Sequence, residues 1–436
     1  MATPLKQIFS NKALRKKILI TVALLVVYKL VAHIPVPGAN LEFLKSVFDQ
    51  AGGGALGALS ALTGGGFDSF SIVLMGLSPY INASIIMQLL GVIIPKLEAI
   101  RKDGKRGYEQ INKYTRWLTL PLAFVQSYGM IVLLNAMSGN VGGSVVEPSM
   151  ILPAMITATA GTLFLMWLGE VITEKGIGNG VSLIIFASIV TQVPQFIFQQ
   201  LGILQEDSSA IYSFGLVLLV TVLLLVFVVW FTEAERRVPV TYAEHGDRGM
   251  EKSMLPIRLN QAGMVPIIFG VSMVTFPSII ANLVTRFSTN PTMLSIADWI
   301  QANFNPSSPT FWYGSIYFLF IIFFSYFYVS ITFQPEKLAE DIQKRGGFIP
   351  GVRPGKETEN FLAKVSSHLT LWGGLFIGLV AVLPYLLNYF TTQSGISGNI
   401  QLLITGAGTI IIVGVVIELM KKIKTEMVMK DYDKFY

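Results

Sequence analysis

Side chains that could perform catalysis are few in this sequence, and they lie far apart. The three histidines, His33, His245 and His368, show no metal-ligand spacing. Residues 351–357 lack both the spacing and the Ser or Thr of a nucleotide-binding loop. Cysteine is absent, which excludes a thiolate nucleophile, a thiolate metal site and a disulfide framework. No local signature of a Ser–His pair is present, so we predict a non-enzyme with neither a cofactor nor a metal site.

Basic side chains on two long loops are better candidates for chemistry, and that chemistry is binding. Residues 233–262 contain Arg236 and Arg237, and residues 334–365 contain Arg353 between two Pro-Gly pairs. Pro-Gly pairs favour tight turns, so we expect a rigid tip that presents Arg353. Two interpretations remain open: the loops lie near anionic lipid, or they dock a protein or ribosomal RNA.

The composition indicates which elements hold these loops. Of the 436 residues, 52% are hydrophobic and only 13% are charged, compared with about 25% charged residues in a soluble domain. The apolar runs are continuous and about 20 residues long, which is the length that crosses a bilayer as a helix. A transmembrane β-barrel would instead show shorter alternating segments. We therefore predict an all-α, polytopic membrane protein.

Ten hydrophobic runs are long enough to span a membrane. The first follows a basic stretch but has no cleavage site of small residues, so we interpret it as a retained span rather than a signal peptide. The predicted spans are 18–37, 70–94, 115–137, 150–170, 181–201, 210–232, 263–285, 312–333, 366–389 and 398–419.

The basic residues test this topology independently. When the loops are assigned alternately to two sides, all of the 32 Lys and Arg residues fall on one side except Lys29, Lys45 and Arg286. The positive-inside rule then places both termini in the cytoplasm. A wrong number of spans would scramble this separation.

Five spans in each half predict an inverted repeat, because a repeated unit with an odd number of spans must be inverted in the membrane. We expect the halves to be residues 1–205 and 206–436. This layout occurs in both channels and transporters, and a small-solute transporter is the alternative function. No Asp, Glu, Lys or Arg lies within 176–205, 259–285 or 365–417, which disfavours ion-coupled transport.

The segment 51–66 has an unusual composition, with seven glycines around the short apolar core 55–62. Eight helical residues extend only about 12 Å, which is too short to span a bilayer. The pattern fits a re-entrant helix between glycine hinges, and it also fits an ordinary outer loop.

Six motifs, in order along nearly the whole chain, together resemble the SecY family, whose members form the channel of the bacterial Sec protein translocase. The motifs are HIPVPG at 33–38, ALSALTGGGF at 58–67, GLSPYINASII at 76–86, GIGNGVS at 176–182, RRVPV at 236–240 and PGVRPG at 350–355.

The resemblance implies a pore between the two halves, through which unfolded secretory polypeptide crosses the plasma membrane or leaves sideways into lipid. It also implies a constriction of aliphatic side chains, which would close by dewetting. Ile412 is an alternative to Ile411 in this constriction. The implied pore ring is Leu77, Ile81, Val181, Ile185, Ile268 and Ile411.

Two further sites are implied by the resemblance. The segment around 55–66 corresponds to a plug helix beneath the ring, carried by Ala55, Leu56, Leu59 and Leu62 with the glycine hinge Gly64, Gly65 and Gly66. The lateral gate lies between spans two and three on one half and seven and eight on the other. Its implied residues are Asn82, Gln88, Ser272, Thr275 and Phe276.

The resemblance also implies partners that supply energy and complete the channel. These are the SecE and SecG subunits, the SecA motor ATPase, the ribosome, secretory and membrane-protein substrates, and anionic lipids. The first cytoplasmic loop is short after Tyr242, and acidic residues dilute its charge, which makes Arg353 the stronger docking candidate. The implied partner-binding residues are Arg236, Arg237, Arg248, Arg353 and Lys356.

Overall fold

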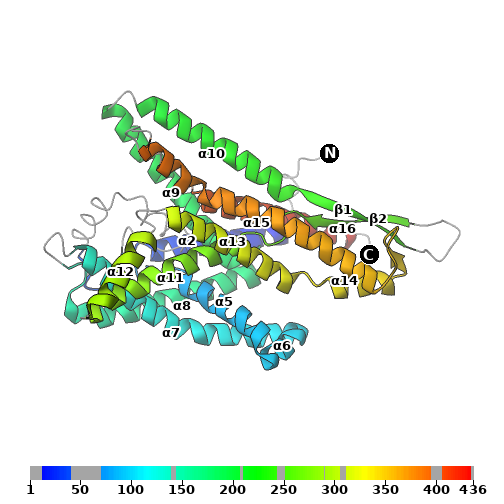
Figure 1. The fold of residues 1–436 in the computed structure, drawn as a ribbon, viewed down its shortest axis with the longest axis horizontal. Helices are drawn as coiled ribbons and strands as arrows, with labels where there is room; N and C mark the ends of the chain where they lie inside the picture. Colours follow the sequence, from blue (N-terminus) through cyan, green and yellow to red (C-terminus); the bar gives the residue numbers. More distant parts are fainter. Residues whose placement is uncertain are drawn as a thin grey trace. The chain divides into compact units, whose positions relative to one another are not determined.

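A computed structural model describes residues 12–40, 70–138, 144–206, 210–242, 251–288, 290–304, 311–393 and 405–433. The predicted plug residues and Arg248 lie outside this described part of the chain. Figure 1 shows a mainly helical chain, which agrees with the predicted all-α class. Its helices are α2 (Lys12–Val31), α5 (Ser78–Ile93), α6 (Pro95–Lys102), α7 (Gly104–Ser138), α8 (Ile151–Lys175), α9 (Gly180–Glu206), α10 (Ala210–Glu233), α11 (Val265–Phe287), α12 (Pro291–Phe304), α13 (Phe311–Thr332), α14 (Pro335–Lys344), α15 (Lys356–Gln393) and α16 (Gly406–Asp433).

Within the described residues, five helical stretches are long and apolar enough to cross a membrane. They are Pro148–Lys175, Gly180–Phe198, Phe214–Glu233, Trp312–Lys344 and Lys356–Leu387. The pair α5 and α6 counts as a sixth if it is treated as one span, although the two helices meet at 107°. The total of ten spans stays a prediction.

The predicted span 70–94 differs from the structure at its N-terminal end, where the helix begins only at Ser78. Gly76 has φ of 53°, a conformation that interrupts a right-handed helix, and Pro79 occupies the first turn of α5. Upstream, the amide of Val36 donates to the Phe70 carbonyl at 2.8 Å. The N-terminal part of this predicted span is therefore held by backbone pairing with the residues after α2.

The chain divides into two compact units, and each is described by itself. The first unit comprises residues 1–211, 275–310 and 415–436, and the second comprises residues 212–274 and 311–414. The predicted halves, 1–205 and 206–436, stay a prediction.

The first unit contains α5 to α9 and an apolar cluster around the segment that leads into α5. Asn135 fixes one side of this cluster, because its side-chain amide donates to the Val146 carbonyl and accepts from the Val146 amide, both at 2.9 Å. The buried members are Val36, Phe70, Leu74, Ile131, Leu134, Val145, Val146, Ala154 and Met155.

The second unit contains a small sheet that the sequence did not predict. Strand β1 (Glu235–Tyr242) pairs antiparallel with β2 (Glu251–Arg258) and with the short β3 (Gly347–Phe348), in the order β2-β1-β3. Figure 1 shows β1 continuing from the end of α10. The sheet covers an apolar cluster whose buried members are Val238, Val240, Ile257, Ile342, Ile349, Leu362 and Leu369.

Candidate functional site

Four of the predicted pore-ring residues lie in the first unit, at the beginnings of two helices. Leu77 is the N-cap residue of α5, and Ile81 lies one turn later. Val181 and Ile185 occupy the first two turns of α9. Leu77, Ile81 and Ile185 are buried, while Val181 is half-buried and faces α8, since a Cβ on Gly169 would lie 3.3 Å from its Cγ2.

The other two predicted ring residues lie in the second unit. Ile268 is half-buried near the start of α11, and Ile411 is fully buried in α16. Ile412, the alternative to Ile411, is half-buried. Each of these positions therefore carries an aliphatic side chain that is at least partly withdrawn from the surface, which is the chemistry that a dewetting constriction requires.

The predicted gate residues are also distributed over both units. Asn82 and Gln88 are half-buried in α5, and the Gln88 amide donates to Ser84 Oγ within the same helix at 3.2 Å. Ser272, Thr275 and Phe276 follow one another along α11. The structure describes the side chain of Ser272, which is half-buried, but not those of Thr275 and Phe276.

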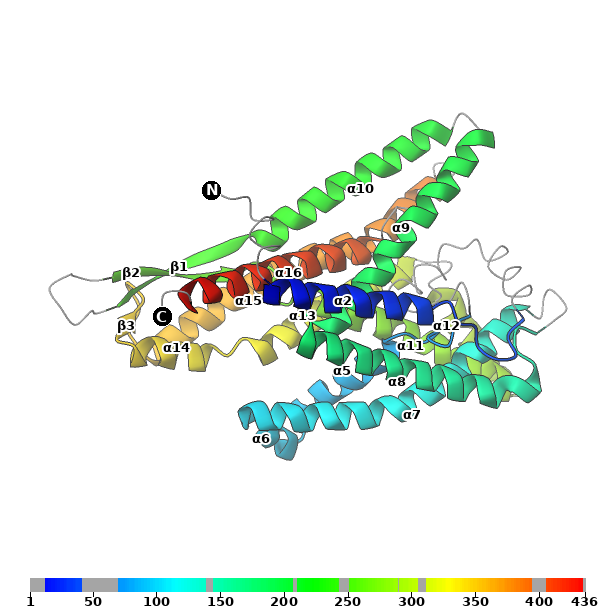
Figure 2. The ribbon, with the colours of Figure 1, turned by 180° about the vertical axis from the view of Figure 1, so that it is seen from behind.

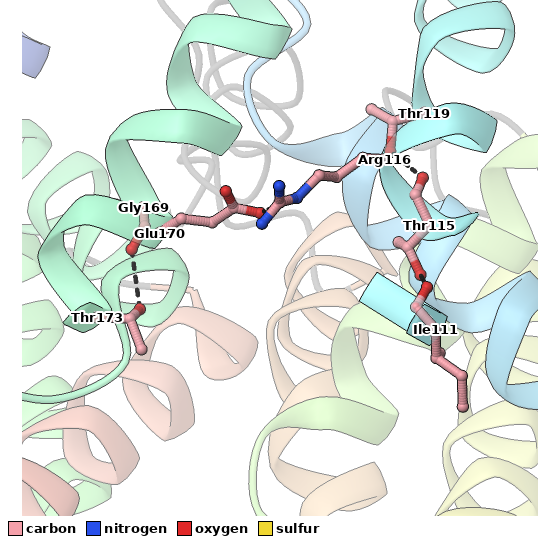
Figure 3. Close-up of polar contacts among 7 residues, drawn as sticks. All are labelled: Ile111, Thr115, Arg116, Thr119, Gly169, Glu170 and Thr173. Carbon is pink, nitrogen blue, oxygen red and sulfur yellow. Dashed lines mark hydrogen bonds and ion pairs between the residues drawn. The ribbon is translucent and has the colours of Figure 1, made fainter. Parts of the chain in front are cut away.

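An ion pair between α7 and α8 was not predicted. Figure 3 shows Arg116 of α7 and Glu170 of α8 extending toward one another, and Arg116 Nε lies 2.7 Å from Glu170 Oε1. In the sequence, Glu170 lies at the end of the predicted span 150–170. The signal in the sequence that could have predicted this ion pair is an acid and a base near the ends of two neighbouring spans, because charged side chains in such positions usually pair.

The predicted docking residues lie on and beside the three-stranded sheet. Arg236 and Arg237 are exposed near the start of β1, and Arg237 Nε lies 3.0 Å from Glu235 Oε1. This ion pair partly neutralises the cationic character of the strand. Arg353 and Lys356 are exposed after β3.

A tight turn holds the segment that presents Arg353. The Val352 amide donates to the Ile349 carbonyl at 3.0 Å, and Gly351 has φ of 85°. Proline at the second position and glycine at the third are the residues that a type II turn requires. The Arg353 carbonyl then accepts from Thr358 Oγ1 at 2.9 Å, so the backbone is fixed while the guanidinium stays exposed.

Helix α14 packs beside this turn and carries charges on its exposed face. Lys344 Nζ lies 2.9 Å from Glu340 Oε2, one helical turn away. The hydrogen bond that Lys344 donates to the Glu340 carboxylate raises the pKa of Lys344 above its ordinary value. Among the described residues, no group of three or more His, Asp or Glu side chains could hold a metal ion.

Comparisons with known proteins agree on one family. The family model described as SecY matches residues 71–420. Protein translocase subunit SecY of Streptomyces coelicolor is 37% identical over 450 residues, which cover 100% of both chains. The subunit of the same name from Aquifex aeolicus is 36% identical over 443 residues, covering 100% of this chain and 99% of that one.

Solved structures of similar fold are protein-conducting channels. A SecY structure from work on how the plug domain stabilises the closed channel has a TM-score of 0.67 and 18% identity, covering 95% of this chain and 92% of that chain. Sec61 from the canine ribosome–channel complex has a TM-score of 0.65 and 18% identity, covering 95% of this chain and 93% of that chain. On the family match and the full-length relatives, this chain belongs to the SecY family.

Proposed function

We infer that this chain is the channel-forming subunit of a protein translocase and conducts polypeptides across the plasma membrane. The observation that carries this inference is full-length similarity to translocase subunits, on a chain whose helices are long and apolar enough to span a bilayer. The chain is a multi-pass membrane protein and not an enzyme. We place both termini in the cytoplasm, on the distribution of Lys and Arg.

The proposed conduit is closed by the aliphatic ring Leu77, Ile81, Val181, Ile185, Ile268 and Ile411. Aliphatic walls exclude water and ions from a narrow constriction without a charged gate. They also offer a passing chain no fixed hydrogen-bond partner, so binding is weak and tolerant of sequence. The segment 55–66 would seal the resting channel as a plug, and the helices that carry Asn82, Gln88, Ser272, Thr275 and Phe276 would part to release hydrophobic segments into lipid.

The proposed energy source docks on the cytoplasmic sheet and the turn beside it. Arg353 is exposed on a backbone fixed by two hydrogen bonds, which suits a cation that must meet an anionic partner in one orientation. Arg236, Arg237, Arg248 and Lys356 would extend this surface. The partners are a ribosome or the SecA motor ATPase, with SecE and SecG as membrane subunits and anionic lipids around the complex.

A single-cysteine crosslink tests the conduit, since the chain has no cysteine of its own. One cysteine replaces Ile81, and a second, separate variant replaces Leu219, which is 58% exposed on α10. Each variant is assembled with its partners and given an arrested secretory chain that carries one cysteine. We expect a disulfide at position 81 and none at position 219. Absence of both crosslinks in the intact complex would contradict the channel and leave solute transport as the function to test.

Charge reversal at the turn tests the docking surface. Arg353→Glu removes the exposed cation and adds a repulsive charge, so we expect binding of the motor or ribosome to weaken about tenfold or more. Lys337→Glu, exposed in the first turn of α14, makes the same change in charge at the end of that helix that is further along the chain from the turn. Equal affinities of the two variants for the partner would contradict a specific role for Arg353.

A further inference from the structure

Residues 176–180 form the turn between α8 and α9, and two threonines from outside this turn hold its backbone. The buried Ile177 amide donates to Thr21 Oγ1, which lies on α2, at 3.1 Å. The Gly180 amide donates to Thr173 Oγ1, on α8, at 2.8 Å. Figure 2 shows α2, α8 and α9 in the first unit, and the turn joins two of these helices.

Each of these hydroxyls makes two hydrogen bonds at once. Thr21 Oγ1 donates to the Lys17 carbonyl at 2.9 Å, and Thr173 Oγ1 donates to the Gly169 carbonyl at 2.8 Å, as Figure 3 shows. A hydroxyl is able to donate to its own helix while it accepts from the turn. Valine has nearly the same shape but no hydroxyl, so it would leave a turn amide unpaired, which is costly where the amide is buried.

The turn has little room for an alternative path. A Cβ on Gly180 would lie 1.9 Å from the Gly169 carbonyl oxygen, and a Cβ on Gly176 would lie 2.4 Å from Thr21 Oγ1. Gly178 has φ of 85°, a conformation that side-chain-bearing residues rarely adopt. The backbone therefore touches both threonine-bearing helices directly, and its position depends on theirs.

The first turn of α9 starts from this backbone. Asn179 Oδ1 accepts from the amides of Val181 at 3.1 Å and Ser182 at 3.3 Å, which is the hydrogen bonding of a helix N-cap. Val181 is the second residue of α9, and Ile185 follows one turn later. A displacement of the turn would therefore move both predicted ring residues on α9.

We propose that Thr21 and Thr173 are positioning residues, which fix the start of α9 and thereby hold Val181 and Ile185 at the places where they seal the pore. This inference rests on the proposed function, because it gives the ring of the channel a support outside the ring. The two threonines act through the backbone of residues 176–180, to which their hydroxyls are hydrogen-bonded.

The test measures how well a ring position is protected in the closed channel. A single cysteine replaces Ile185, which is buried, and the protein is reconstituted with its partner subunits in lipid vesicles. The rate of labelling by a membrane-impermeant maleimide is then compared in the parent, Thr21→Val and Thr173→Val backgrounds. We expect each valine variant to label roughly fivefold faster, because loss of a hydrogen bond that is buried (Thr21) or partly buried (Thr173) shifts a conformational equilibrium by about that factor.

Conservative and matched variants separate positioning from a general loss of structure. Thr21→Ser and Thr173→Ser keep the hydroxyl and should return labelling to the parental rate. Thr159→Val removes a buried hydroxyl that donates within α8 to Met155, and Thr157→Val removes an exposed one that donates to Pro153; both should label like the parent. Parental labelling rates in Thr21→Val and Thr173→Val, or no rescue by serine, would overturn the proposal.

A second measurement distinguishes failure of this inference from failure of the proposed function. The same Ile185→Cys variant is tested for a disulfide with an arrested secretory chain. A disulfide together with unchanged labelling in the valine variants overturns the positioning role alone. Faster labelling in the valine variants without any disulfide supports the positioning role of Thr21 and Thr173 at the start of α9. It also overturns the proposal that Ile185 lines a polypeptide pore.

Discussion

Helices α8 and α10 are both long and apolar, yet they are packed very differently. Half of the most apolar part of α8 is buried within the chain, compared with 17% for α10. The buried face of α8 is built largely from small residues, including Ala154, Ala158, Gly161 and Gly169. Helix α10 instead exposes large side chains such as Leu219 and Phe227. Because lipid is as apolar as leucine, close packing of small residues determines which helices associate in a membrane.

The sharpest way to break this comparison is to add one methyl group to a glycine on each helix. Gly161→Ala would place a Cβ 1.9 Å from the Ile72 carbonyl oxygen, whereas a Cβ on Gly215 of α10 meets nothing within 4 Å. We expect Gly161→Ala to lower the free energy of unfolding by about 3 kcal/mol, since α8 cannot move away from backbone. Gly215→Ala should leave it unchanged or raise it by about 0.5 kcal/mol.

Unfolding of the purified protein in detergent measures both variants. A Gly161→Ala protein as stable as Gly215→Ala would show that α8 and the segment before α5 do not pack closely, and it would remove the basis of the comparison.

Removing a large side chain from each helix sharpens the comparison with a smaller effect. Leu165 of α8 is 0% exposed, whereas Leu219 of α10 is 58% exposed. Leu165→Ala leaves a cavity among packed helices, and we expect a loss of about 2 kcal/mol. Leu219→Ala exchanges one lipid contact for another, so we expect no measurable loss. Thermal unfolding of the two variants side by side checks this, and similar losses would contradict the assignment of α10 to the lipid.

The smallest expected effect concerns the ion pair that joins α8 to α7. The side chains of Arg116 and Glu170 are 51% and 30% exposed, so solvent and headgroups screen the attraction between the two charges. We expect Glu170→Gln to cost about 0.5–1 kcal/mol, and Glu174→Gln, exposed one turn later, to cost nothing measurable. A double-mutant cycle with Arg116→Gln isolates the pair, and zero coupling energy would show that close packing alone holds α7 on α8.

The sequence predicted the class of fold because hydropathy and the separation of basic residues are strong, redundant signals. It did not predict where helices would give way to extended backbone. The segment before Ser78 is as apolar as a helix interior, but Gly76 and the backbone pairing of Val36 with Phe70 decide its structure. Local composition carries no information about that distant pairing.

The three-stranded sheet was not predicted for a related reason. Residues 235–242 alternate in burial only over 238–240, and their proline and charges look like those of a loop. The partner strands and the apolar cluster beneath them make this segment a strand. The predicted Pro-Gly turn was recognisable because proline and glycine act through their own backbone conformations.

Some residues of the candidate site were predicted from the sequence and others were not. The aliphatic ring positions and Arg353 were proposed from motifs, because side-chain type is visible in a sequence, and their roles stay predictions. Thr21 and Thr173 were not, since a threonine that braces a neighbouring turn looks the same as one that bonds within its own helix. Thr159 is a residue of that second kind, and only the coordinates distinguish the two.

The pairing of β1 with β3 has a consequence for how these two segments evolve. A Cβ on Gly347 would lie 2.6 Å from the Tyr242 ring and 3.0 Å from Ile342, so the segments 233–262 and 334–365 share one contact although they are far apart in the chain. A change at Tyr242 that opens space should tolerate a larger residue at Gly347, and the reverse order should not survive. We expect suppressors of damage in one loop to arise in the other, so that these loops evolve as one unit.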